Sequence, residues 1–262
     1  MDTIERIKVF EAPVDVVTFD TALGTVCALA KDHTRVHTIA TINTEKTFIM
    51  AKNEEIRSYI ERADLIIPDG IGIVKAVKIL YGRQLERVAG ADLMQSLCEI
   101  SGKHGLRIYI YGSKETVNAS AVDKIRERYP DVRIVGRSHG YVPPEKNEEL
   151  ISDINQSNAD ILFLALGSPA QEHWVDRNAD HLNVAVCMGI GGTLDTIVGT
   201  VKRAPKSWQA HGLEWLYRLI RQPKRIWRSR KIFLFALRVF WVKLFGHSVV
   251  EAESLDTDSS DS

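Results

Sequence analysis

Six short apolar runs constrain the fold of this 262-residue chain more than any other feature. They are rich in β-branched residues and lie at 36–43, 64–68, 107–112, 132–136, 160–167 and 183–189. Segments with helical periodicity separate them, at 53–63, 72–81, 90–104, 114–129, 144–158 and 171–180. Continuous apolar strands that alternate with helices are typical of a parallel sheet covered on both faces. Residues 1–200 therefore predict one doubly wound α/β domain with a mostly parallel, Rossmann-like sheet.

Charge divides the chain into three segments, although the formal net charge is zero. Residues 201–247 carry 12 basic residues and one acidic residue, and residues 248–262 carry five acidic residues and no basic one. Residues 1–200 hold the other 22 basic and 28 acidic residues. We expect an α/β domain over 1–200, a basic and aromatic helical appendage over 201–247, and an acidic, disordered tail over 248–262.

Cysteine usage and hydropathy predict a cytoplasmic chain that does not cross a membrane. The three cysteines are too far apart for a disulfide framework or a metal pair: Cys27, Cys98 and Cys187. The charged N-terminus lacks the apolar region of a signal peptide. The longest apolar stretch, residues 232–245, contains Arg238 and Lys243 and is shorter than the roughly 20 residues of a membrane span.

Ligands of doubly wound folds bind at the carboxyl ends of the strands, so the loops there are the place to look for function. Several of these loops place glycine just before a helix, where backbone N–H groups suit a phosphate. The candidates are Gly112 with Ser113, the segment from Gly136 to Tyr141, Gly167, and the segment 189–192 that leads to Asp195. An ordinary tight turn explains any one of these glycines equally well. The dinucleotide and P-loop fingerprints are absent.

Asp69 is the carboxylate that stands out. It follows the apolar run Leu-Ile-Ile-Pro and precedes Gly70, which places it at a strand end. A partly desolvated carboxylate there can act as a general base. Spacing alone equally allows Asp69 to cap the helix that begins near Gly72.

Uncharged polar side chains occupy neighbouring strand ends. Thr41 and Asn43 can bind a hydroxylated ligand or form local turns. Gln171 and Glu172 can contact the same ligand or cap the first turn of their helix. Metal-binding signatures are lacking, since the one Asp-x-Asp lies at 256–258 in the acidic tail. We therefore expect neither a metal site nor a cofactor.

The appendage interleaves basic and aromatic residues. Residues 201–247 contain four of the five tryptophans, and arginines recur at three- or four-residue spacing from Arg218 through Arg225 to Arg228. Such helices lie on anionic membrane surfaces, pack on a core, or stack on single-stranded nucleic acid. The acidic charge of residues 1–200 argues against nucleic acid. We favour an anionic membrane surface as the partner, then packing, and expect no nucleic acid.

Seven motifs, in order, resemble those of the WecG/TagA/CpsF glycosyltransferases. The resemblance runs from about residue 10 to residue 245. The motifs are TINTEK at 41–46, PDGIGIV at 68–74, RVAGADL at 87–93, LGSPAQE at 166–172, GG with Asp195 at 191–195, VKRAP at 201–205 and GLEWLYR at 212–218.

The resemblance implies a metal-independent, inverting transfer of a sugar from a UDP-sugar to a polyprenyl-diphosphate-linked sugar. The enzyme would work peripherally at the cytoplasmic face of the cell membrane. In the teichoic-acid branch the donor is UDP-N-acetylmannosamine and the acceptor is N-acetylglucosamine-diphosphoundecaprenol. Other branches use UDP-N-acetylmannosaminuronic acid, or glucose for exopolysaccharides, so the donor stays open. Whether the chain forms a homo-oligomer is also open.

The resemblance also assigns roles to residues. Asp69 matches the catalytic base. Thr41, Asn43 and Gln171 match sugar-site positions, Arg87 matches the RVAG arginine, and Tyr141 and Asp195 match the nucleotide side. Arg218, Arg225 and Arg228 match arginines that close over the diphosphate.

Two other classes of function stay open on the sequence. A scaffold that binds a nucleotide or a lipid diphosphate without catalysis would explain the loops and the appendage, but not Asp69. An NAD(P)-linked oxidoreductase would lack its usual fingerprint.

Overall fold

The computed structural model describes residues 4–201 and 226–246 together with residues 205, 208 and 217, with backbone only at 226–230. The first part of the appendage and the acidic tail therefore lie almost wholly outside the described residues. The elements are β1 (Arg6–Val9), β2 (Ala12–Asp15), α1 (Phe19–Leu29), β3 (His37–Ile42), α2 (Thr44–Met50), α3 (Glu54–Glu61), β4 (Leu65–Pro68), α4 (Ile71–Tyr81), α5 (Gly90–His104), β5 (Ile108–Gly112), α6 (Glu115–Arg128), β6 (Ile134–Ser138), η1 (Pro144–Lys146), α7 (Asn147–Gln156), β7 (Ile161–Ala165), α8 (Ala170–Asn178), η2 (Ala179–His181), β8 (Val186–Gly189), α9 (Thr193–Val198) and α12 (Ile226–Phe245).

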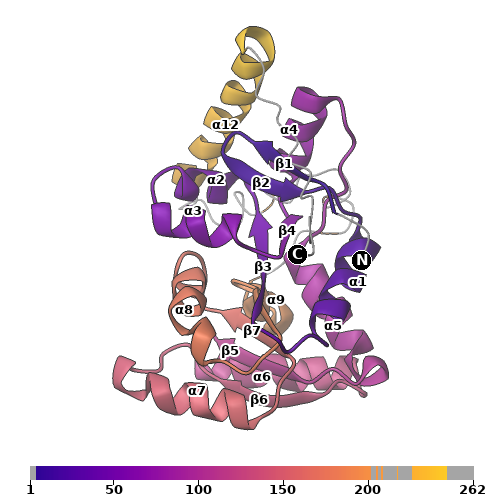
Figure 1. Ribbon diagram of the computed structural model, residues 1–262, viewed down its shortest axis with the longest axis vertical. Helices are drawn as coiled ribbons and strands as arrows, with labels where there is room; N and C mark the ends of the chain where they lie inside the picture. The colour runs from indigo at the N-terminus through magenta and orange to yellow at the C-terminus, as the bar shows by residue number, and fades with distance from the viewer. Residues whose placement is uncertain (1–3, 202–204, 206–207, 209–216, 218–225, 247–262) are drawn as a thin grey trace, which may run out of the picture.

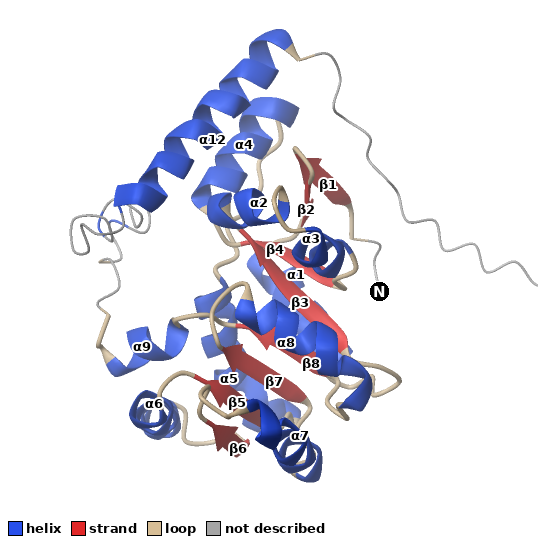
Figure 2. Ribbon diagram, turned by 90° about the vertical axis from the view of Figure 1, so that its left-hand side faces the viewer, coloured by secondary structure: helices blue, strands red, loops and turns tan. Residues whose placement is uncertain are grey.

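Six strands form one sheet in the order β4-β3-β8-β7-β5-β6, and every neighbouring pair is parallel (Figure 2). The six predicted strands are all present, with ends that differ by at most three residues. All six carboxyl ends lie at one edge, because the strands run in the same direction. The predicted α/β class with a parallel sheet is confirmed.

Five of the six strands, all but the edge strand β6, are largely buried on both faces, because alternate residues enter different cores. On β7, Ile161 and Phe163 belong to one core cluster with residues of α1, α5, α6 and α9. Leu162 and Leu164 belong to the other, with residues of α3, α4, α7 and α8. Figure 1 shows these helices around the strands. All four side chains are fully buried. This two-sided burial explains why the strands read as unbroken apolar runs rather than as alternating patterns.

A small antiparallel hairpin, β1–β2, precedes the sheet and was not predicted. Its buried anchor is Asp15, whose carboxylate accepts hydrogen bonds from Arg6 Nε at 2.6 Å and from the Ile66 N–H at 2.7 Å. The second bond joins the hairpin to β4. Helices α1 and α2 were not predicted either.

Helix α12 packs on α2 and α4, with Phe235 and Val239 buried in the core they share. The Phe235 ring meets Phe10 at the hairpin tip edge-on, with ring centroids 5.4 Å apart. Arg238 lies over the same Phe10 ring at 4.1 Å and pairs with Glu11 at 3.1 Å. Packing on the core is therefore part of what the second half of the appendage does.

The outer face of α12 is exposed and apolar. Its exposed large apolar side chains are Phe233, Leu234, Leu237, Phe240, Trp241, Leu244 and Phe245, and Arg238 and Lys243 are also exposed. A contiguous surface of this kind marks a contact with another molecule or a membrane. Within the described ranges, no helix is long and apolar enough to span a bilayer.

The cysteines are free thiols without the environment of a nucleophile. Burial raises the pKa of Cys98 to about 12 and raises that of Cys187 further. Thiols with such pKa values stay protonated near neutrality, so neither residue supplies a thiolate for catalysis.

Phe235→Ala should lower the free energy of unfolding by about 3 kcal/mol, because it empties a buried aromatic site. Phe233→Ala removes the same kind of side chain from the exposed face of the same helix. It should change the free energy of unfolding by less than about 0.5 kcal/mol. Urea unfolding followed by circular dichroism measures both. Equal, small effects would show that α12 does not pack on the core in solution.

Candidate active site

Asp69 lies directly after β4, at the carboxyl edge of the sheet. Its backbone N–H donates to Ile42 O on β3 at 3.0 Å, and the Gly70 N–H donates to the same oxygen at 3.2 Å. A side chain at position 70 would stand 2.7 Å from Asn43 Cβ, so only glycine fits there. The first turn after β4 is thereby fixed against the end of β3.

The Asp69 carboxylate faces the start of α5. Its Oδ1 accepts a hydrogen bond from the Gly90 N–H at 3.1 Å, at the first residue of that helix. Negative charge is stabilised there by the helix dipole. The alternative that Asp69 caps the helix that follows it is wrong, because α4 has Gly70 at its N-cap and no side-chain cap.

Arg87 ties the RVAG segment to the same strand end. Its Nε donates to Asp69 O at 2.7 Å, and the Val88 N–H donates to Pro68 O at 3.0 Å. Arg87 and Asp69, predicted from distant motifs, are thus brought together. The guanidinium contributes positive charge next to the candidate base.

Asn43 caps α2, which is the local role that the sequence allowed beside ligand binding. Its Oδ1 accepts from the Lys46 N–H at 3.0 Å. The Asn43 side-chain NH₂ group donates to no described residue, so it is available to a ligand. Thr41, two residues earlier on β3, lines a small cavity of about 10 Å³ with Gln171. A cavity of this size is at the lower limit for one water molecule.

Gln171 does not cap its helix, since α8 begins at Ala170 with Pro169 at the N-cap and no side-chain cap. Its Oε1 accepts from the Gly191 N–H at 3.2 Å, and its Nε2 donates to Glu172 Oε1 at 3.2 Å. Both hydrogen bonds fix a buried side chain between the ends of β7 and β8. Gln171 thus connects the Thr41 region to the glycine loop at 189–192.

A buried ion pair between Lys46 and Glu172 lies behind this edge and was not predicted. The Lys46 ammonium contacts Glu172 Oε1, and each residue is 4% exposed. The other Glu172 oxygen, Oε2, is buried without a hydrogen-bond partner. The pair joins α2 to α8 across 126 positions of sequence. Lys46 belongs to the TINTEK motif, but nothing in the sequence marks it as buried.

The loops after β5, β6 and β7 form a second group. Gly112 has φ +129°, and a side chain there would approach the Ala165 backbone to 2.5 Å. The Ser113 N–H donates to Ala165 O at 2.9 Å, and the Gly140 N–H donates to Ser113 O at 2.7 Å. The N–H groups of Ser113 and Gly140 are therefore not free for a phosphate, and a ligand role for Gly112 and Ser113 stays a prediction.

Other expected ligand groups at this edge are open to a ligand. Among the described residues, the N–H groups of Gly167 and Gly192 donate to no protein acceptor. The Tyr141 side chain is 68% exposed. Asp195 lies in the first turn of α9 and accepts from the Thr200 hydroxyl at 3.2 Å.

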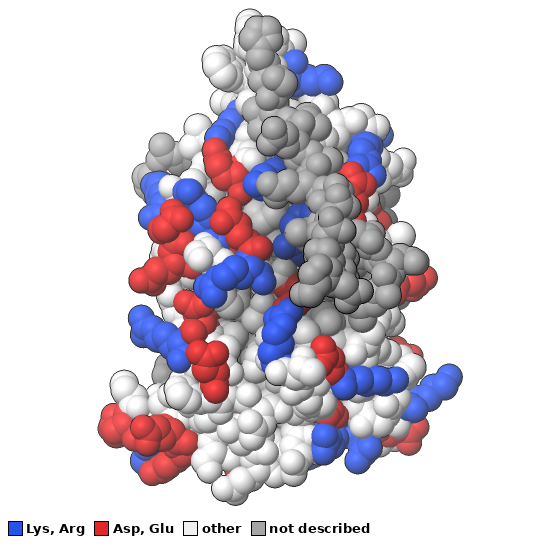
Figure 3. Space-filling view, viewed as in Figure 1, with Lys and Arg blue, Asp and Glu red and all other residues white. Residues whose placement is uncertain are grey.

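The appendage arginines are not part of the described site. Arg218 and Arg225 lie outside the described residues, and Arg228 is described in its backbone alone. Within the described residues no group of three or more His, Cys, Asp and Glu could hold a metal ion. On the face shown in Figure 3, basic and acidic side chains are interspersed rather than gathered into a basic stripe.

Fold and site together define an α/β protein whose ligand groups gather along the carboxyl edge of a parallel sheet. The model of the glycosyl transferase WecG/TagA/CpsF family matches residues 7–249. The chain therefore belongs to the WecG/TagA/CpsF family of glycosyltransferases. Family membership also associates the chain with synthesis of cell-surface polysaccharides.

Lys46→Met should destabilise the fold by about 3–5 kcal/mol, because it leaves the Glu172 carboxylate buried without its cation. The double variant Lys46→Met, Glu172→Leu should recover most of this loss, since a packed apolar pair often replaces a buried ion pair without cost. Urea unfolding of both single variants and the double variant measures the coupling. Additive losses would show that the two side chains do not pair.

Proposed function

We propose that the protein transfers a sugar, most simply N-acetylmannosamine, from a UDP-sugar to an N-acetylglucosamine-diphosphoundecaprenol-type acceptor with inversion. A sugar donor and a lipid-linked acceptor follow in general from the family. The observation that carries the proposal is the position of Asp69, a carboxylate fixed at a strand end beside Arg87 and the polar residues of β3.

In the proposed reaction Asp69 is the general base. The acceptor hydroxyl oxygen attacks the anomeric carbon of the donor and gives its proton to the Asp69 carboxylate. The bond between that carbon and the UDP oxygen breaks, and UDP leaves with the bonding electrons. The Gly90 N–H hydrogen bond holds the carboxylate in one orientation, which positions its oxygens to accept the proton.

The departing diphosphate gains negative charge, which cations and N–H groups can stabilise. The N–H groups of Gly167 and Gly192 are candidates on the α/β domain. Arg218, Arg225 and Arg228 are candidates on the appendage, by family resemblance. The proposal assigns this stabilisation to the protein's own groups and does not require a metal.

The acceptor's lipid gives the outer face of α12 a function. That face carries aromatic and aliphatic side chains, and Lys231, Arg238 and Lys243 lie on the same helix. Helices of this composition bind at the interface of anionic membranes. We place the protein peripherally at the cytoplasmic face of the cell membrane, with α12 in contact with the lipid.

Asp69→Asn should keep the fold and lower turnover by roughly 100-fold or more, since the amide cannot accept the proton. Asp123→Asn, on the exposed surface of α6, removes a carboxylate of the same kind and should leave turnover unchanged. UDP release measures turnover, with an N-acetylglucosamine-diphospholipid acceptor.

The donor panel for this assay contains UDP-N-acetylmannosamine, UDP-N-acetylmannosaminuronic acid and UDP-glucose. The donor that is turned over identifies the branch of the family. UDP binding without turnover of any donor would favour a scaffold that does not catalyse, and an active Asp69→Asn variant would remove Asp69 from the chemistry.

The double variant Leu237→Glu, Trp241→Glu should reduce binding to anionic vesicles at least tenfold, because it places charges on the exposed apolar face. Val135→Glu, a partly exposed apolar residue of β6, is the matched control and should bind like the wild type. Co-sedimentation with phosphatidylglycerol vesicles measures both. Undiminished binding by the double variant would contradict a membrane role for α12.

A further inference from the structure

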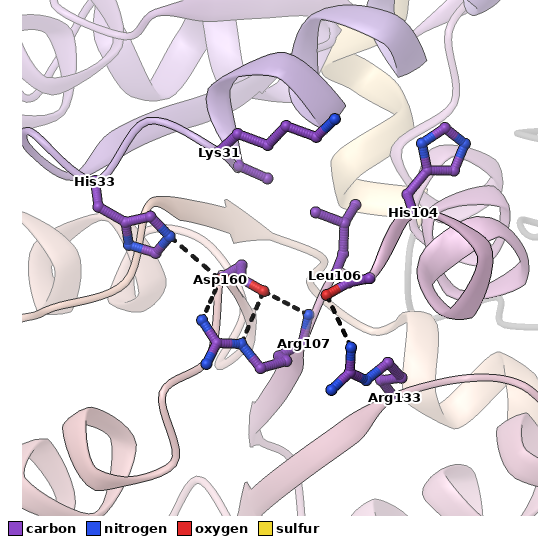
Figure 4. A pocket seen from close by; sticks show the side chains of 9 residues that line it. Lys31, His33, His104, Leu106, Arg107, Arg133 and Asp160 are labelled. Atoms are coloured by element: carbon purple, nitrogen blue, oxygen red, sulfur yellow. Dashed lines mark hydrogen bonds and ion pairs between the residues drawn. The ribbon is translucent and has the colours of Figure 1, made fainter.

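A cavity of about 420 Å³ opens at the amino edge of the sheet, opposite the edge that carries Asp69. It lies where α1 and α5 end and where β5 and β7 begin. Figure 4 shows the side chains around it. They are Ala30, Lys31, His33, His104, Gly105, Leu106, Arg107, Arg133 and Asp160.

Basic side chains dominate this cavity. Lys31, Arg107 and Arg133 carry permanent positive charges, and Asp160 is the one carboxylate among the lining residues. Desolvation by burial acts to raise the pKa of Asp160, but hydrogen bonds from Arg107 outweigh it and lower the pKa. Asp160 is therefore charged at neutral pH. With the imidazoles counted as uncharged, three cations and one anion leave two positive charges.

Asp160 is already satisfied by its neighbours. Arg107 donates to it through Nη2 at 2.7 Å and Nε at 3.1 Å, and His33 Nε2 lies 3.2 Å from it. These contacts neutralise Asp160 and leave the other cations of the cavity without a carboxylate.

Three donors around the opening have spare capacity. The Lys31 ammonium and the His104 imidazole form no hydrogen bond to any described residue. Arg133 donates to Gly105 O at 3.2 Å through Nη1 and to nothing else described through its side chain. In Figure 4 these three side chains stand around the same opening, with Leu106 between them.

A helix-end role explains part of this arrangement. Lys31 and His104 lie at the ends of α1 and α5, where positive charge offsets the helix dipole. That role needs charge near the helix end but no concave site. Lys103, one residue before His104, supplies positive charge at the end of α5 equally well, and it does not line the cavity.

We propose that this cavity binds the phosphoryl or diphosphoryl group of a small molecule, at a site distinct from the carboxyl edge. The bound group carries at least two negative charges. The volume falls within the range of small-molecule sites. Lysine supplies a compact positive charge, and arginine supplies a planar guanidinium with several N–H donors. Both are typical phosphate ligands. A free diphosphate or nucleotide and a phospholipid headgroup share this chemistry.

Isothermal titration of the full chain with inorganic diphosphate tests the site. One saturable site is expected. Lys31→Met and His104→Gln should each weaken binding by roughly tenfold or more, the usual effect of losing a hydrogen bond to a charged group. Lys103→Met removes the same charge from the end of α5 and should bind like the wild type. Thermal unfolding confirms that all variants fold.

Competition then identifies the source of the phosphate. UDP that displaces diphosphate from the wild type, with a loss of its own affinity in Lys31→Met, assigns the site to a nucleotide. Phosphatidylglycerol vesicles that displace it assign the site to a lipid headgroup. The proposal is overturned if none of the three ligands binds in a way that is weakened by Lys31→Met, because UDP bound at the carboxyl edge would not depend on Lys31. It is also overturned if Lys31→Met and His104→Gln behave like Lys103→Met, which would leave the cations a helix-end role only.

Discussion

One carbonyl group organises the candidate active site. Ile42 O, at the end of β3, accepts hydrogen bonds from both the Asp69 and the Gly70 N–H groups. These bonds continue the β3–β4 register, in which Ile42 faces Pro68, for two residues beyond the sheet. The turn that carries Asp69 therefore cannot move independently of the strand that carries Thr41. The position of Asp69 is therefore fixed by hydrogen bonds to the sheet, as a residue in a surface loop would not be.

The features that depend on burial and strand direction, namely the six strands and the edge that carries the candidate site, could be predicted from the sequence. All six parallel strands were found from apolar runs, and five of them are covered on both faces; the edge strand β6 has Val135 and Arg137 exposed. Their carboxyl ends then located Asp69, Thr41 and Gln171 at one edge, while the family resemblance supplied their roles. The hairpin β1–β2 was missed because its strands are four residues each and turn at Phe10-Glu11, without the usual glycine or asparagine.

Contacts between distant residues were beyond reach of the sequence. Lys46 and Glu172 lie 126 positions apart, and no local pattern distinguishes a buried lysine from an exposed one. The expectation of a free N–H group at Ser113 was wrong for a related reason. Gly112 is required because the Ala165 backbone passes close to it, and that same approach occupies the Ser113 N–H. Glycine marks close packing as well as phosphate binding, and a sequence does not separate the two.

Helix α5 has one end at each edge of the sheet. Its first N–H group, at Gly90, holds the Asp69 carboxylate, and its last residue, His104, lines the cationic cavity. A helix of 15 residues is about 22 Å long and moves as one rod, because each turn is bonded to the next. A shift or tilt of α5 at His104 would therefore move the Gly90 N–H group and alter its hydrogen bond to Asp69.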